Sequence, residues 1–265
     1  MIIELNNVFK IYLKNIIKNK LSFDGEVIME KRGKLYGIGV GPGDPELITV
    51  KAVKILKQVD VVYSASSSKN DHSMAFDIAS RYIPKKTKCI FLPFPMVLDK
   101  EEAEKYWRSH AERVKEDVYN GKDVAFLTVG DPLTYSTFGY LLKCLKEIAP
   151  DVEIIIIPGI TSYQASAAVT KTVLAEGEEV LTVVSGVKGG DHLRRLSTIS
   201  DNIIFLKAYK NIKDIYAALK ETGRLKSSVA VKRCGFADQE IIHNIEELLN
   251  KKALYWTLII SKKGK

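Results

Sequence analysis

The residues best suited to chemistry lie in four short loops, each of which follows an apolar run. Glycine lets the backbone of such a loop turn tightly and approach a ligand closely, while Asp, Ser, Thr and Tyr supply hydrogen-bonding groups. In open α/β sheets, ligands bind beyond the carboxyl ends of the strands. The sequence therefore predicts a ligand site built largely from loop backbone, in residues 37–44 (GIGVGPGD), 64–68, 130–136 (GDPLTYS) and 158–162 (PGITS).

The first of these loops does not match the known phosphate-binding patterns. The dinucleotide fingerprint G-x-G-x-x-G has Pro42 at its sixth position when counted from Gly37, and Asp44 when counted from Gly39. No Gly-Lys-Ser/Thr follows, so a phosphate loop is not indicated either. A nucleotide oxidoreductase loses support, and the glycines predict a tight turn with close backbone approach.

Cysteine and histidine are too scattered to predict a metal site. Cys89, Cys144 and Cys234 lie far apart without a C-x-x-C pair, and the four histidines are isolated. This distribution argues against a disulfide framework and structural zinc, and it fits a reducing, cytoplasmic compartment. We expect no metal site, and a structural or solvated role for each histidine. No apolar run approaches the ~18 residues of a transmembrane helix.

From residue 34 onward, strand-like and helix-like segments alternate, which predicts a largely parallel sheet covered by helices. We expect strands at 35–40, 60–63, 89–92, 124–129 and 152–157, the last of them buried. The helices between them are expected at 46–58, 73–83, 100–120 and 136–148.

The second half repeats this alternation after a small-residue helix at 162–171. We expect strands at 180–185, 202–206, 229–232 and 255–260, and helices at 191–197, 212–220 and 245–250. The fold class is therefore α/β, with two domains of mainly parallel or mixed sheets and an active-site cleft between them. We expect the domains at residues 34–170 and 171–265, and an N-terminal extension at 1–33.

The chain carries a net charge of +8, and residues 1–33 contribute +2 because they contain six Lys/Arg and four Asp/Glu. A basic surface attracts nucleic acid, acidic lipid or a polycarboxylate, and charge alone does not choose among them. No RNP motif, zinc finger or aromatic–basic stripe supports a nucleic-acid-binding module, which stays a distant alternative.

Taken in this order and at these separations, residues 39–44, 130–132 and 158–162 resemble the signature of the tetrapyrrole methylases, the class III methyltransferases. The resemblance covers roughly residues 34–261. Another member of the family, such as a uroporphyrinogen-III C-methyltransferase, stays the alternative to its precorrin-2 C(20)-methyltransferase branch. The segments that resemble this branch are 35–47 (LYGIGVGPGDPEL), 94–96 (FPM), 123–136 (DVAFLTVGDPLTYS), 136–138 (STF) and 174–178 (LAEGE).

The resemblance implies a homodimeric, S-adenosylmethionine-dependent C-methyltransferase of cobalamin biosynthesis. Its substrate is then precorrin-2 or cobalt-precorrin-2, methylated at the meso carbon C20, and we expect no nucleic-acid or membrane partner. Carried over by position, the cofactor contacts are Pro42, Gly130, Asp131, Leu133, Tyr135, Ser136, Thr161, Ser162, Leu206, Lys207, Ala208, Cys234 and Gly235.

Methyl transfer suits such a site, because an in-line displacement from a sulfonium depends on positioning and needs no metal. The acceptor carbon belongs to an electron-rich macrocycle, so the protein needs only a modest base. Asp131, Tyr135 and Asp44 are the candidates for this catalytic role. Asp131 is equally a candidate for fixing the shape of its loop.

Overall fold

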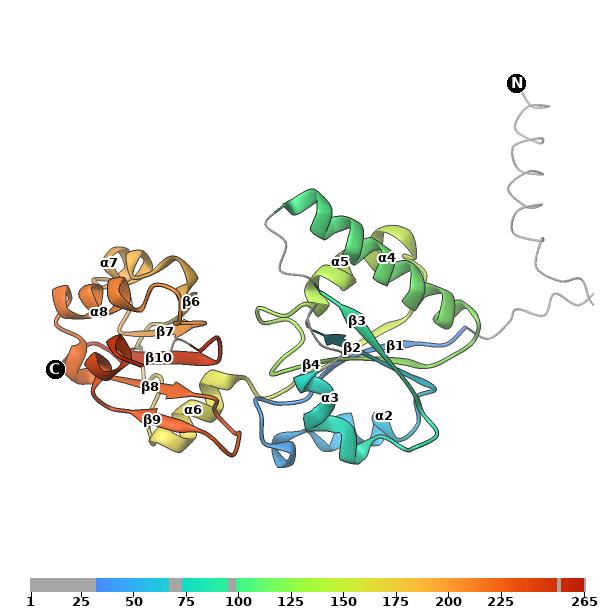
Figure 1. The fold of residues 1–265 in the computed structure, drawn as a ribbon, viewed down its shortest axis with the longest axis horizontal. Helices are drawn as coiled ribbons and strands as arrows, with labels where there is room; N and C mark the ends of the chain where they lie inside the picture. Colours follow the sequence, from blue (N-terminus) through green and yellow to red (C-terminus); the bar gives the residue numbers. More distant parts are fainter. Residues whose placement is uncertain (1–31, 67–72, 95–98, 252–253, 265) are drawn as a thin grey trace, which may run out of the picture.

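Residues 32–66, 73–94, 99–251 and 254–264 are described by a computed structural model, and they form two five-stranded sheets that follow one another along the chain (Figure 1). The two-part α/β architecture expected from the sequence is confirmed. Most of the expected N-terminal extension, and the end of the serine loop at 67–68, lie outside the described residues. Within the described ranges, no helix is long and apolar enough to cross a membrane.

The first sheet is parallel throughout, with the strand order β3-β2-β4-β1-β5. Because β4, β1 and β5 are neighbours that run the same way, the loops that follow them meet at one edge of the sheet. This edge is where the glycine-containing loops lie. The strands are β1 (Leu35–Gly39), β2 (Val61–Ser66), β3 (Lys88–Pro93), β4 (Val124–Thr128) and β5 (Ile154–Ile157).

Helices cover both faces of this sheet, because successive side chains of each strand point to opposite faces. On β4, Phe126 packs in the apolar cluster that includes α4 and α5, whereas Leu127 packs with α2 and α3. Figure 1 shows these two helix layers on either side of the sheet. The helices are α2 (Val50–Leu56), α3 (Met74–Ala79), α4 (Lys100–Tyr119) and α5 (Phe138–Ile148), with 3-10 turns at Pro45–Leu47 and Ser80–Tyr82.

The second sheet is mixed, with the order β6-β7-β10-β8-β9 and one parallel pair, β6 with β7. Helices α7 and α8 pack on one face and α6 on the other. Its strands are β6 (Leu181–Ser185), β7 (Asn202–Leu206), β8 (Ser228–Lys232), β9 (Glu240–Ile242) and β10 (Thr257–Lys262). Its helices are α6 (Ser162–Thr170), α7 (Asp191–Leu196) and α8 (Ile212–Glu221), with 3-10 turns at Gly186–Lys188, Leu225–Ser227 and Ile245–Leu249.

Helix α6 connects the two sheets and packs on the second one. Ala165 of α6 joins the buried cluster that contains Ile204 of β7 and Leu258 of β10. Thr161 begins the helix with a capping box, in which Thr161 Oγ1 accepts a hydrogen bond from Gln164 N and Gln164 Oε1 accepts one from Thr161 N. The domain boundary expected at residue 170 stays a prediction.

One expected helix is in fact two elements. Residues 46–58 form the turn Pro45–Leu47 and then α2. Each element has its own N-cap, since Asp44 Oδ1 accepts from Glu46 N at 2.8 Å and Thr49 Oγ1 accepts from Ala52 N at 3.2 Å. A capping residue has non-helical backbone, so Thr49 interrupts the helical pattern that the apolar residues suggest.

Two strands also differ from expectation. The run Ile154–Ile157 was expected to be buried, but β5 is an edge strand, and three of its four residues are only half-buried. Its composition does not reveal its position in the sheet. Strand β9 was missed because three residues with one glutamate are too short for an alternating pattern to be recognised.

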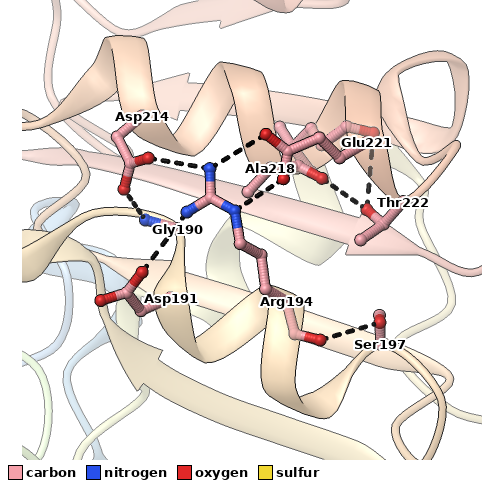
Figure 2. A network of polar contacts seen from close by, with 9 residues as sticks. Gly190, Asp191, Arg194, Ser197, Asp214, Ala218, Glu221 and Thr222 are labelled. Carbon is pink, nitrogen blue, oxygen red and sulfur yellow. Dashed lines mark hydrogen bonds and ion pairs between the residues drawn. The ribbon is translucent and has the colours of Figure 1, made fainter.

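A single arginine ties α7 to α8 (Figure 2). Arg194 Nε donates to Glu221 at 2.6 Å and its Nη2 donates to Asp214 at 2.9 Å, while Asp191 lies 3.4 Å from Nη1. The other oxygen of Asp214 accepts from Gly190 N at 2.7 Å. The guanidinium of Arg194 is therefore fully engaged between these two helices.

Candidate active site

The glycine loops after β1, β4 and β5 pack directly against one another. Gly130 N donates to Gly41 O at 2.7 Å, and Gly41 N donates to Gly130 O at 3.4 Å. A Cβ atom on Gly159 would lie 2.1 Å from Gly130 O, and one on Gly39 would lie 2.5 Å from the same oxygen. Side chains are therefore excluded at these positions, because the backbones of the three loops fill the space.

The carboxylate of Asp131 joins the loop after β4 to the loop after β5. Its Oδ1 accepts from Leu133 N at 2.9 Å and from Thr134 Oγ1 at 3.4 Å, and its Oδ2 accepts from Gly159 N at 3.2 Å. Both oxygens thus have donors within the protein. This geometry favours the loop-fixing role over proton transfer for Asp131.

The loop after β4 continues with a strained tyrosine and a serine whose hydroxyl belongs to a partly buried pair. Tyr135 has a left-handed backbone with φ of 51°, and 52% of the residue is exposed. Ser136 Oγ accepts from Phe138 N at 3.1 Å and lies 2.8 Å from Thr128 Oγ1. A left-handed non-glycine residue costs about 1–3 kcal/mol, and such residues cluster at functional sites.

The second sheet presents a matching edge. Strands β7 and β8 lie on either side of β10, and Ala208 N donates to Thr257 O at 2.8 Å while Arg233 N donates to Trp256 O at 2.9 Å. The residues that follow β7 and β8 therefore lie beside the start of β10. Lys207 and Arg233, which directly follow these strands, have left-handed backbones with φ of 58° and 47°.

The two edges meet where the first glycine loop touches the loop after β8. A Cβ atom on Gly43 would lie 2.7 Å from Cys234 O, and one on Gly235 would lie 2.7 Å from Asp44 N. Between the edges lies a cleft of about 940 Å³. Its lining includes ten of the residues expected to contact a cofactor, namely Pro42, Gly130, Asp131, Tyr135, Ser136, Thr161, Ser162, Leu206, Lys207 and Cys234.

Four expected site residues do not line the cleft. Leu133 is 60% exposed, and Ala208 is buried in the cluster beneath α8. Gly235 packs on the backbone of Asp44, whose side chain caps the turn Pro45–Leu47. The structure does not place these four residues in the cleft lining with the ten named above. The assignment of all the site residues stays a prediction.

Several cleft residues escaped sequence reasoning. Tyr255 and Trp256 line the cleft, although the sequence suggested that they belong to the strand that begins only at Thr257. Phe236 and Trp256 lie 6.4 Å apart between ring centroids. The sequence feature that could have indicated this wall of the cleft is the aromatic pair Tyr255–Trp256, directly before the strand. Ser66 also lines the cleft, and it belongs to the loop at 64–68 that the sequence assigns to the ligand site. The other unexpected lining residues include Ser73, Met74 and Phe94. Phe94 belongs to the FPM segment, whose Pro95 and Met96 lie outside the described residues.

The cleft is lined mostly by apolar, hydroxyl and backbone groups. Burial raises the pKa of the Cys234 thiol, so this residue lines the cleft as a small neutral side chain. On the opposite wall, Ser73 Oγ lies 2.5 Å from Ser64 Oγ and caps α3. Among the described residues, no group of three or more His, Cys, Asp or Glu is arranged to hold a metal ion. The groups at hand can hold and orient a ligand through hydrogen bonds and apolar contact.

Two curated proteins resemble this chain in sequence over most of their length. The chain is 39% identical over 210 residues to a Methanocaldococcus jannaschii protein named probable cobalt-precorrin-2 C(20)-methyltransferase, a match that covers 79% of this chain and 86% of that protein. It is 30% identical over 232 residues to the cobalt-precorrin-2 C(20)-methyltransferase of Salmonella typhimurium, covering 87% and 97%.

Solved structures share the fold. The uroporphyrin-III C-methyltransferase of Thermus thermophilus, solved in complex with S-adenosyl homocysteine, superposes with a TM-score of 0.62 at 23% identity and covers 87% of this chain and 98% of its own. The family model of the tetrapyrrole (corrin/porphyrin) methylases matches residues 34–249. With this match over most of its length and two relatives at 30% identity or more, the chain belongs to the tetrapyrrole methylase family.

Proposed function

We propose that this protein transfers a methyl group from S-adenosylmethionine to the meso carbon C20 of precorrin-2 or cobalt-precorrin-2. The observation that carries the proposal is the 39% identity to the Methanocaldococcus protein of that name, which extends over 79% of this chain. The uroporphyrin-III enzyme shares the fold at 23% identity and represents the alternative reaction within the family.

The residues of the cleft fit S-adenosylmethionine. At Gly39 and Gly159 the backbone of neighbouring loops fills the space of a Cβ atom, so the loops pack together as one wall beside the cleft. The cleft volume of about 940 Å³ lies at the upper end of the range for small-molecule sites, roughly 300–1,000 Å³. When bound, the cofactor supplies an electrophilic methyl group on a sulfonium.

The protein contributes mainly position and exclusion of water. Asp131 holds the loops after β4 and β5 together through Leu133 N and Gly159 N, and so fixes the wall against which the cofactor lies. The transfer forms a carbon–carbon bond, breaks a carbon–sulfur bond and releases the proton of the acceptor carbon. Tyr135, which lines the cleft, remains a candidate for handling this proton, and Asp44 and Asp131 are weaker candidates because both already accept backbone hydrogen bonds.

We further propose that the enzyme works in the cytoplasm as a homodimer, without a nucleic-acid or membrane partner. Apolar side chains exposed in the loop after β4 and on α5 support an association between copies, since Leu133 is 60% exposed and Tyr140 is 48% exposed. Sedimentation equilibrium tests this part of the proposal. A mass of one subunit at micromolar concentration contradicts it.

The reaction is tested by offering labelled S-adenosylmethionine with precorrin-2, cobalt-precorrin-2 and uroporphyrinogen III in parallel. We expect one methyl group to be added at C20 of one or both of the first two compounds, as located by mass spectrometry and NMR. Efficient methylation of uroporphyrinogen III alone would assign the protein to the alternative reaction. Transfer to none of the three would overturn the proposal.

A further inference from the structure

Charge inside the cleft is sparse and one-sided. Only three charged residues line it among the described parts of the chain, namely Asp131, Lys207 and Arg233. The two carboxylate oxygens of Asp131 already accept hydrogen bonds from Leu133, Thr134 and Gly159. The carboxylate of Asp131 is thus held within the loops of the first sheet, and among the described residues it forms no ion pair with Lys207 or Arg233.

Lys207 is a half-buried ammonium without an acidic partner. None of the described carboxylates forms an ion pair or hydrogen bond with its Nζ, which lies 5.4 Å from the centroid of the Tyr255 ring. A lysine held over an aromatic ring at the wall of a cleft is partly desolvated, and an anion strengthens such an arrangement. Its left-handed backbone, with φ of 58°, sets the direction in which the residue leaves β7.

Arg233 is engaged on one side only. Its Nε donates to Asp238 Oδ1 at 2.5 Å, and its Cζ lies 4.6 Å from the centroid of the Phe236 ring. No described residue hydrogen-bonds the two terminal Nη atoms, although 27% of the side chain is exposed. The planar guanidinium is thus oriented, and the N–H groups of its two Nη atoms can donate to a carboxylate.

The two cations are placed as a pair. Lys207 follows β7 and Arg233 follows β8, and β10 lies between these strands. Since neighbouring strands lie about 4.8 Å apart, the two backbones are separated by about 10 Å. Tyr255 and Trp256, which precede β10, line the cleft between them, with ring centroids 5.2 Å apart. The wall therefore presents an aromatic surface flanked by two cations.

Other basic residues near the same sheet are not available for this purpose. Arg194 is surrounded by Asp191, Asp214 and Glu221 (Figure 2). Arg195 is exposed beside His192 and does not line the cleft. Among the described residues, the tertiary structure thus brings two cations to the cleft, from a chain with 40 Lys and Arg.

We propose that Lys207 and Arg233 form a carboxylate receptor that holds two acidic side chains of a flat polycarboxylate macrocycle against the Tyr255–Trp256 surface. This inference rests on the proposed function for the identity of the ligand. It assigns substrate selection and orientation to these two side chains, while the backbone of the same loops is left for the cofactor. A receptor of this kind distinguishes macrocycles by the number and spacing of their carboxylates.

The test measures the tetrapyrrole and the cofactor separately. Lys207→Gln and Arg233→Gln should each raise the KM for precorrin-2 about tenfold, the effect of losing a charge-assisted hydrogen bond that is partly exposed. The Kd for S-adenosylhomocysteine, measured by calorimetry, should stay within about twofold, because the cofactor is assigned to the loop backbone and not to these side chains. A twofold change lies well below the loss of one such hydrogen bond. Lys207→Arg should restore most of the affinity, and the salt dependence of KM should weaken in the Gln variants.

Lys210→Gln is the matched control, since Lys210 lies three residues beyond Lys207, is exposed and does not line the cleft, and its Nζ lies 5.9 Å from the centroid of the Tyr209 ring. This variant should leave the KM for precorrin-2 unchanged. Thermal unfolding of all variants checks that the fold is intact. An unchanged KM in both Lys207→Gln and Arg233→Gln would overturn the receptor, and so would a loss of S-adenosylhomocysteine affinity equal to the loss of substrate affinity, which would assign these cations to the cofactor carboxylate.

A stable probe separates this inference from the reaction itself. Uroporphyrin III, a polycarboxylate macrocycle, should quench the fluorescence of the wild-type protein at lower concentration than that of Lys207→Gln, and a cationic pyridylporphyrin should show the opposite order. If the wild type transfers no methyl group but this order holds, the proposed reaction fails and the receptor stands. If methyl transfer occurs and the two porphyrins do not discriminate between the proteins, the receptor fails alone.

Discussion

At the scale of single residues, the site depends on glycines, which lack a Cβ atom, as much as on side chains. Gly39 and Gly159 let three loop backbones approach so closely that one carbon atom added to either would collide with Gly130 O. Asp131 then connects two of these loops, because its carboxylate accepts hydrogen bonds from backbone N–H groups of both. The shape of this wall of the cleft is therefore set by backbone packing, and we expect a conservative substitution there to have a large effect.

Gly159→Ala should reduce the free energy of unfolding by about 1–3 kcal/mol, the range for overpacking, because its Cβ would lie 2.1 Å from Gly130 O. Urea denaturation measures this loss. Gly139→Ala is the control, since a Cβ there meets no atom within 4 Å, and Gly139 lies in α5, where alanine is the better helix former. Equal stability of the two variants would contradict the packing argument.

Asp131→Asn should weaken S-adenosylhomocysteine binding by about tenfold, since an amide cannot accept at both of its positions and one backbone N–H of the loop pair loses its partner. Calorimetry provides the measurement. Asp99→Asn, at the N-cap of α4 outside the cleft lining, keeps an acceptor for Glu101 N and should bind the ligand normally. Unchanged binding in Asp131→Asn would remove this residue from the site.

At the scale of elements, turns and strand ends are held by a few buried polar groups. Arg224 is 1% exposed, and its guanidinium donates to the carbonyl oxygens of Ser197, Ser200 and Asp201 at 2.7–3.0 Å. These bonds fix the turn between α7 and β7, and β7 in turn positions Lys207. On the first sheet, His110 of α4 plays a comparable part for the end of β3.

Arg224→Met should cost about 2–4 kcal/mol of stability, because the carbonyl oxygens of Ser197 and Ser200 lose this donor, while Asp201 O keeps only Lys263 N. Chemical denaturation with urea gives the value. The exposed Arg195 offers the comparison, and Arg195→Met should change stability by less than about 0.5 kcal/mol. A loss in Arg224→Met no larger than in Arg195→Met would show that solvent replaces these bonds.

His110 predicts a pH dependence of stability. Burial lowers the pKa of His110, and nearby Arg113 lowers it further, although the hydrogen bond from Nε2 to Pro93 O, at 2.7 Å, opposes both. The unfolded chain therefore binds this proton more readily than the folded protein does. The contribution of His110 to stability is complete above the unfolded pKa of about 6.5 and is lost progressively as the pH falls below it.

This dependence is measured by urea denaturation between about pH 7.5 and pH 5, the interval that spans the unfolded pKa. His110→Gln keeps a donor for Pro93 O and cannot titrate, so its stability should fall less over this interval than that of the wild type. His243 is exposed, and His243→Gln should reproduce the wild-type slope. Parallel curves for the wild type and His110→Gln would exclude His110 as the origin.

At the scale of the whole molecule, two sheets turn their loop-bearing edges toward one cleft. The first sheet contributes mainly backbone, hydroxyl and apolar groups together with the carboxylate of Asp131, and the second contributes the Tyr255–Trp256 surface and the two cations. The net charge of +8 surrounds both. A ligand with several carboxylates is thus attracted over a distance and then held locally, whereas the uncharged parts of a cofactor are held by contact alone.

Added salt should raise the KM for precorrin-2 more steeply than the Kd for S-adenosylhomocysteine, because exposed charges are screened beyond about 8 Å at physiological ionic strength. Steady-state kinetics and calorimetry measure the two slopes. Both use about 50 to 300 mM NaCl, a range over which the Debye screening length shortens steadily. Similar slopes for both ligands would mean that net charge plays no particular part in recognising the tetrapyrrole.

The sequence by itself determined the alternation of strands and helices, the glycine-containing loops and the membership in a methyltransferase family. These features are local, since strand and helix periods, turn residues and short motifs are read within a few positions. They were sufficient to predict ten of the residues that line the cleft. They failed at Thr49, whose local N-cap splits the helix that the apolar pattern suggests, and in β5, whose position at a sheet edge depends on the other strands.

Only the tertiary structure decided what the second wall of the cleft contains. Strand β10, the last in the chain, inserts between β7 and β8, and this insertion brings Tyr255 and Trp256 between Lys207 and Arg233. No local pattern encodes that neighbourhood, because strand pairing is set by long-range packing of side chains that are distant in sequence. The same packing engages Arg194 with three carboxylates and leaves Lys207 facing the cleft without an acidic partner among the described residues.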